Sequence, residues 1–173
     1  QKVTQTRILG RFGAFARSTL DWEPRHLDVL MQSGFTHVAT RFARAARAFD
    51  DGVSAADIYQ AGRNVFTMNG LQRLLGLPVR LTPAVFAYSM LYPYSDNLLD
   101  APNVAHETKI EFNRRFTLRL MGHPFEPVDE RERAIDDLVS LIEEQYPRDV
   151  YPEVHESLLA IHRAQIRSVA IST

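Results

Sequence analysis

Apolar residues recur at spacings of three and four along almost the whole chain. Such spacing gathers apolar side chains on one side of a helix, whereas no segment alternates with the period of two that is typical of a strand. The pattern predicts about seven helices with short connections, and therefore an all-α helical bundle.

Cap and breaker residues mark the expected helix ends. Ser54 and Asp57 have the spacing of a capping box, and Gly76 is suited to closing the helix that follows. Thr82 before Pro83 predicts the next helix start. The expected helices cover 3–19, a stretch from Pro24 with a possible break at Gly34, 55–75, a segment from Pro83, 105–122, 129–147, and a last helix from Pro152 that carries Val154, Leu158, Ile161 and Ile166.

The composition is that of an ordinary folded domain. The 173 residues are 45% hydrophobic and 24% charged, so we interpret residues 1–173 as one helical domain. A net charge of −1 provides no field that would attract nucleic acid, and the absence of Cys excludes disulfides and zinc-thiolate sites.

Segments for membrane insertion or export are not evident in the sequence. No apolar run approaches the roughly twenty residues that a membrane span needs, and the N-terminus lacks a signal-peptide pattern. We therefore expect a cytoplasmic protein. The chain starts without Met and ends within a helical pattern, so we expect it to be the N-terminal part of a longer domain.

The stretch "AYSMLYPYSDNLLDAP", residues 87–102, carries the most specific chemistry. Asp96 and Asp100 are four residues apart, so on a helix their carboxylates share one face and repel each other. Pro102 places Asp100 in the last turn, where the helix dipole disfavours an anion. A divalent cation removes both costs, and Mg²⁺ typically takes one or two carboxylates. The alternative is turn chemistry, in which Asp100 only ends the helix.

Aromatic residues precede the acidic pair and offer faces that stabilise a cation. Pro93 lies inside the expected helix and predicts a kink just before the pair. If Ser95 instead begins a new turn, the four-residue geometry is only approximate. Phe86, Tyr88, Met90, Tyr92 and Tyr94 belong to this segment.

The motif "YSDNLLD" on an aromatic helix resembles the first aspartate-rich motif of the class I isoprenoid (terpenoid) synthases. The likeness is closest to squalene/phytoene synthase-like and related bacterial enzymes. It implies that Asp96 and Asp100 hold Mg²⁺, which binds the diphosphate of a prenyl diphosphate substrate and assists its ionisation to an allylic carbocation. Such an enzyme of isoprenoid biosynthesis is a transferase or a lyase. Tyr88, Tyr92 and Phe86 would line its cavity, and Asn97 stands where many members have a second aspartate.

The family carries a second metal motif on a later helix. The acidic group of "AIDDLVSLIEE" consists of Asp136, Asp137, Glu143 and Glu144, but its helix already has a complete apolar face, so we interpret these acids as solvated. We expect the second motif beyond Thr173. An incomplete bundle exposes apolar faces, so we also expect a homo-oligomer.

A polar stripe on the helix over 55–75 has two open interpretations. Gln60, Arg63, Asn64 and Thr67 either line a cavity, with Arg63 reaching a diphosphate, or form the solvated side of a surface helix. Arg41, Arg44 and Arg47, Arg114 and Arg115, and the pair His155 and His162 are interpreted as surface groups.

Two functions follow from these patterns. The first is a Mg²⁺-dependent isoprenoid synthase with Asp96 and Asp100 as its catalytic metal ligands. The second is a non-catalytic helical bundle that acts as a protein-interaction or regulatory module. They differ in whether Asp96 and Asp100 face an apolar pocket or water.

Overall fold

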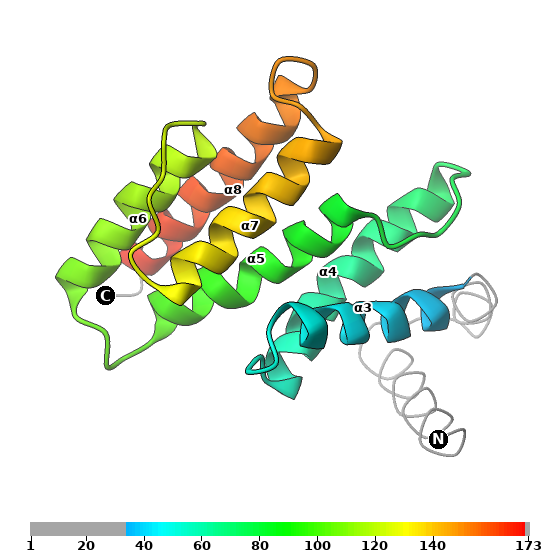
Figure 1. The fold of residues 1–173 in the computed structure, drawn as a ribbon, viewed down its shortest axis with the longest axis horizontal. Coiled ribbons are helices and arrows are strands. Elements are labelled where there is room, and N and C mark those ends of the chain that lie inside the picture. The colour runs from blue at the N-terminus through cyan, green and yellow to red at the C-terminus, as the bar shows by residue number, and fades with distance from the viewer. Residues whose placement is uncertain (1–33, 172–173) are drawn as a thin grey trace.

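The computed structural model describes residues 34–171, without the side chains of Tyr92 and residues 168–171. Over this range the chain forms six helices and no strand, which confirms the predicted all-α class (Figure 1). The helices expected over 3–19 and from Pro24 lie outside the described residues. The described helices are α3 (Phe35–Phe49), α4 (Ala55–Leu74), α5 (Pro83–Asp100), α6 (His106–Leu120), α7 (Glu130–Gln145) and α8 (Pro152–Ile171).

Helix α5 is the central element of the fold. It packs most extensively against α7 and α4, while α3 packs on α4 and α8 packs chiefly on α6. Figure 1 shows α5, α6, α7 and α8 side by side with nearly parallel axes, as one arm of the molecule, with α3 and α4 forming a second arm. Residues of α5 therefore reach both arms of the molecule.

The core is centred on the contact between α5 and α7. Met90 of α5 and Ile135, Leu138 and Ile142 of α7 are fully or almost fully buried. The α7 residues follow the spacing of three, four and seven that defines one helix face. Burying each such side chain contributes about 1.5–3 kcal/mol, so this contact fixes the position of α5.

The helix ends confirm the predicted caps. The Ser54 hydroxyl accepts a hydrogen bond of 3.0 Å from the amide of Asp57, whose carboxylate accepts one of 3.3 Å in return. Thr82 accepts a hydrogen bond from the amide of Val85. Gly76 follows α4 with a left-handed φ of 71°, a conformation that glycine adopts without steric cost.

Helix α5 continues through Pro93 to Asp100. No new helix begins at Ser95, and Asp96 and Asp100 therefore lie one turn apart on the same helix. The buried hydroxyl of Ser95 donates a hydrogen bond of 2.9 Å to the carbonyl of Leu91, four residues earlier.

Among the described helices, none combines the length and the apolar character that crossing a membrane requires. Several large apolar side chains are exposed on the described surface. The expected self-association stays a prediction.

Candidate functional site

Asp96 and Asp100 have different surroundings although they share one helix. Asp96 is half-buried, and its Oδ1 accepts a hydrogen bond of 2.8 Å from Nε2 of Gln165 on α8. Asp100 is exposed at the end of α5 and accepts no hydrogen bond from any described residue. One carboxylate is thus oriented by the fold, and the other projects into solvent.

The turn after Asp100 is built from backbone groups. The amide of Ala101 donates to the carbonyl of Leu98, and Nζ of Lys109 donates a hydrogen bond of 2.6 Å to the carbonyl of Leu99. A cation at this position complements the C-terminal end of the helix dipole. The hydrogen bonds that would make Asp100 a structural stop are not found among the described residues.

Asn97, between the two aspartates, has a structural contact with α4. Its Nδ2 donates a hydrogen bond of 2.7 Å to Oδ1 of Asp57. Burial disfavours the charged form of Asp57, but hydrogen bonds from Ser54 and Asn97 outweigh it and lower the pKa of this carboxyl. Asn97 therefore links α5 to the start of α4, on a different side of α5 from the Asp96 contact with α8.

A narrow pocket lies next to Asp96. Gln165 both lines this pocket and donates to Asp96, so the carboxylate lies at the pocket edge. The volume is about 50 Å³, far below the roughly 300–1,000 Å³ of typical ligand sites. The lining residues are Asn64 of α4, Tyr88, Leu91 and Ser95 of α5, Phe116 and Leu120 of α6, and Leu158, Ile161, His162 and Gln165 of α8.

The aromatic residues of α5 do not share one surface. Tyr88 lines the pocket as expected. The expected place of Phe86 is corrected, because its ring is buried in the core at 5.9 Å from the rings of Phe42 and Phe49. Tyr94 donates a hydrogen bond of 2.6 Å to Asp50, and burial together with that bond raises its pKa. The side chain of Tyr92 lies outside the described part.

The polar stripe of α4 divides between surface and pocket. Arg63 and Thr67 are exposed, and Gln60 is half-buried. Asn64 is half-buried and lines the pocket. The structure brings Asn64 and Tyr88 together at the pocket, and it leaves Arg63 on the solvated side of α4.

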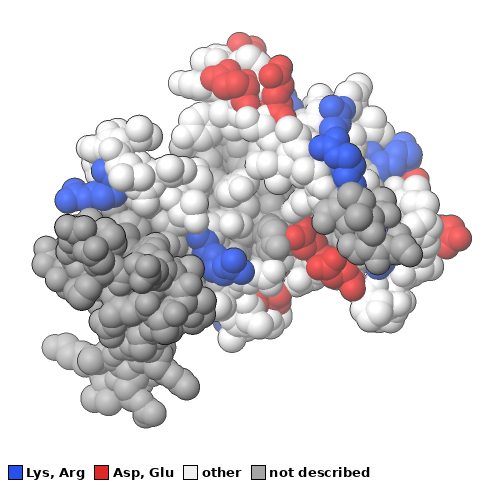
Figure 2. Space-filling view, turned by 180° about the vertical axis from the view of Figure 1, so that it is seen from behind, with Lys and Arg blue, Asp and Glu red and all other residues white. Residues whose placement is uncertain are grey.

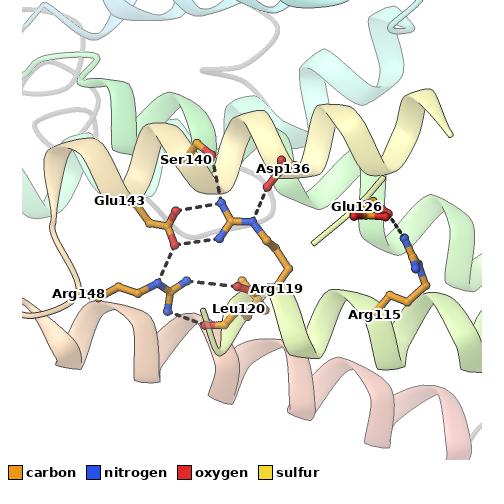
Figure 3. Close-up of polar contacts among 8 residues, drawn as sticks. All are labelled: Arg115, Arg119, Leu120, Glu126, Asp136, Ser140, Glu143 and Arg148. Carbon is orange, nitrogen blue, oxygen red and sulfur yellow. Dashed lines mark hydrogen bonds and ion pairs between the residues drawn. The ribbon is translucent and has the colours of Figure 1, made fainter. Parts of the chain in front are cut away.

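The interpretation of the α7 acids as wholly solvated is wrong for Asp136 and Glu143. Figure 3 shows Arg119 of α6 between them, and the guanidinium donates to Glu143 at 2.8 and 2.9 Å. Arg148 donates to the same Glu143 at 2.6 Å. Asp137 and Glu144 are exposed, as expected. The helical spacing of these acids indicated a second polar face on α7, but it did not show that the Arg119 side chain of α6 reaches that face.

Arg119 and Glu143 stay charged although both are partly or fully buried. Burial lowers the pKa of Arg119, but the hydrogen bonds that its guanidinium donates to Glu143 and Asp136 outweigh this effect and raise the pKa above the ordinary value. Burial also raises the pKa of Glu143, and the two arginines reverse that shift and lower it. Both groups are therefore charged in the folded protein, and removal of Arg119 would leave Asp136 without a described partner and Glu143 with Arg148 alone.

A second buried ion pair joins α6 to the start of α7. Glu132 is buried, and it accepts hydrogen bonds of 3.0 and 2.7 Å from Arg115. The interpretation of Arg115 as a surface cation is therefore corrected, whereas Arg114 is exposed and pairs with Glu111 on its own helix.

The interpretation of His155 and His162 as surface histidines is also wrong. Both are buried, with 5% and 2% of their surface exposed. His155 contacts the carbonyl of Tyr146 at 2.7 Å, and the His162 ring packs 4.5 Å from that of Phe116. Their spacing of seven placed them correctly on one face, but that face packs inward. Ile161, next to His162 on the same helix, is 43% exposed.

No cluster of three or more His, Asp or Glu side chains suited to a metal ion occurs among the described residues. A larger open cleft of about 630 Å³ lies between α3, the α4–α5 connection and α7, with Arg41, Arg80 and Glu144 on its walls. It is formed around the start of α5, whereas Asp96 and Asp100 are at the end of that helix.

No family model, curated protein or solved structure matches this chain.

Proposed function

We propose that Asp96 and Asp100 bind Mg²⁺ together with the diphosphate of a prenyl diphosphate, as in an enzyme of the class I isoprenoid synthase type. The observation that carries the proposal is the unbroken course of α5 through Pro93, which sets the two aspartates one turn apart. Asp100 has no partner among the described residues, so its carboxylate is available.

The donor set is compatible with Mg²⁺. This ion usually takes one or two carboxylates and completes its octahedral shell with water and substrate phosphate. Asp96 and Asp100 supply that number, so a third acidic side chain is not required. When bound, Mg²⁺ would neutralise the charge of the departing diphosphate.

The pocket beside Asp96 supplies an apolar wall for the other end of such a substrate. Tyr88 and Leu91 project to it from the helix that carries the aspartates, and Leu158 projects from α8. A volume of about 50 Å³ is too small for a prenyl chain. Substrate binding therefore requires the pocket to widen, by movement of the Leu158 part of α8 away from α5 while Gln165 keeps its hydrogen bond to Asp96.

Calorimetric titration with geranyl diphosphate tests the proposal. We expect binding that requires Mg²⁺ and is weakened about tenfold or more by Asp96→Asn or Asp100→Asn. Asp137→Asn removes an exposed carboxylate from α7 and serves as the matched control. Binding without Mg²⁺, or equal binding by all three variants, would contradict the assignment.

The non-catalytic helical bundle is the competing function. It predicts no Mg²⁺-dependent heat with geranyl diphosphate for any variant. Binding rather than turnover is the chosen readout because binding at Asp96 and Asp100 does not depend on a second metal motif.

A further inference from the structure

Four leucines at the end of α4 are exposed. Leu71, Leu74 and Leu75 have the spacing of one helix face, and Leu77 follows in the turn. Their exposed fractions are 47%, 84%, 73% and 52%. We refer to these four residues as the leucine tip. Single exposed leucines are ordinary, but a contiguous apolar group at one place marks an interaction surface.

The leucine tip is held in place by hydrogen bonds. The amide of Leu77 donates a hydrogen bond of 2.8 Å to the carbonyl of Gln72, and that of Gly76 donates to Arg73, which together close the helix end. These hydrogen bonds and the left-handed φ of 71° at Gly76 set the direction in which the chain leaves α4.

A second set of hydrogen bonds fixes the chain beyond the turn. The side-chain amides of Asn69 and Gln72 each donate a hydrogen bond of 3.2 Å to the carbonyl of Arg80. Oε1 of Gln72 accepts a hydrogen bond of 2.9 Å from the amide of Arg80. Asn69 is 1% exposed, so this clamp is part of the interior. The leucine tip is therefore a turn whose backbone is fixed by hydrogen bonds and whose leucine side chains point outward.

The surroundings of the tip are cationic. No Asp or Glu occurs between Asp57 and Asp96, whereas Arg73 and Arg80 flank the leucines. Both arginines are exposed and have no acidic partner in the described part of the chain; Glu144 shares a cleft with Arg80 without forming an ion pair. In Figure 2 the lobe at the upper left, which is the end of α4, shows white and blue atoms but no red ones.

We propose that the leucine tip inserts into the interfacial layer of an anionic lipid surface, with Arg73 and Arg80 contacting the headgroups. A projecting turn can bury its bulky apolar side chains in the interfacial layer of a lipid bilayer or in a matching groove of a protein. The flanking cations favour an anionic lipid leaflet. Figure 1 shows the end of α4 extending beyond the neighbouring helices, so a planar surface can reach it. This inference is independent of the proposed diphosphate site.

Vesicle co-sedimentation of the full chain tests this inference. We expect binding to vesicles of phosphatidylcholine with phosphatidylglycerol, and much weaker binding to phosphatidylcholine alone. The double variant Leu74→Ser, Leu75→Ser should lower the partition coefficient at least about tenfold. The double variant Arg73→Gln, Arg80→Gln should lower it about thirtyfold on anionic vesicles, from about fivefold for each arginine.

Matched variants control for unspecific effects. Val128 and Val150 are 71% and 60% exposed outside the tip, so Val128→Ser, Val150→Ser should leave the partition coefficient unchanged. Arg44→Gln on α3 is the corresponding charge control. Absence of vesicle binding, or equal binding by tip and control variants, would overturn the proposal. If vesicles do not bind and Leu74→Ser, Leu75→Ser converts a dimer to a monomer in sedimentation, the tip is a contact between copies and the lipid proposal is wrong.

Discussion

The side-chain amide of Gln165 on α8 donates a hydrogen bond of 2.8 Å to Oδ1 of Asp96 on α5. The two residues are 69 positions apart, and Gln165 also lines the pocket beside the acidic pair. The last described helix therefore orients the first aspartate of the motif.

Replacing Gln165 by Ala tests this positioning. Groups that orient a metal ligand typically change metal affinity about 10–100-fold when removed, so we expect a loss of that size in Mg²⁺-dependent geranyl diphosphate binding. Arg163→Ala, an exposed change on the same helix, should not alter the affinity. Titration calorimetry measures both. If Gln165→Ala binds geranyl diphosphate with wild-type affinity, Gln165 does not orient the metal ligand Asp96.

Replacing Asp100 by Asn separates the metal-ligand interpretation from the structural-stop interpretation. Asp100 accepts no hydrogen bond from described residues, and its charge is unfavourable at a helix C-terminus. The free energy of unfolding should stay equal or rise by about 0.3–1 kcal/mol. Urea denaturation without Mg²⁺ measures it, with Asp137→Asn as the reference. A loss of about 1 kcal/mol would indicate a structural hydrogen bond.

Arg119 and Arg114 on α6 provide a matched pair of ion-pair variants. Arg119→Met leaves Asp136 without a described partner and Glu143 with Arg148 alone, at side-chain exposures of 32% and 27%. We expect a loss of about 2–3 kcal/mol in unfolding free energy, somewhat less than for a fully buried pair. Arg114→Met breaks an exposed pair and should cause no measurable change. Equal losses of unfolding free energy for the two variants in urea denaturation would show that the ion pairs of Arg119 with Glu143 and Asp136 do not stabilise the fold.

Stability should fall as the pH falls below about 6.5 because of His162. Burial lowers the pKa of this imidazole from its ordinary value of 6.5, so the unfolded chain takes up a proton at higher pH than the folded chain. The contribution is complete above pH 6.5 and is lost between 6.5 and the lower pKa of the folded state. Urea midpoints should show a shallower pH dependence for His162→Gln than for wild type.

His123→Gln is the control for this measurement, because His123 is exposed. It should retain the wild-type pH dependence. Parallel curves for His162→Gln and wild type would show that His162 does not contribute.

Local sequence was sufficient to predict the ends of α4 and the start of α5. The Ser54–Asp57 capping box, the Thr82 cap and the glycine after α4 depend on residues within a few positions of one another, and the structure contains all three. The four-residue spacing of Asp96 and Asp100 is equally local, because it requires only that α5 continue through Pro93.

Tertiary structure decided which helix face meets which partner. The sequence pattern of Asp136 and Glu143 predicts a solvated face, but in the fold Arg119 pairs with both acids. The pattern of α8 likewise predicts His162 at the surface, but the packing of α8 against α6 buries it. A helical pattern gives the side on which a residue lies, but not the element that covers that side. The pairing of Asp96 with Gln165 arises in the same way, because helix packing brings together residues that no local pattern relates.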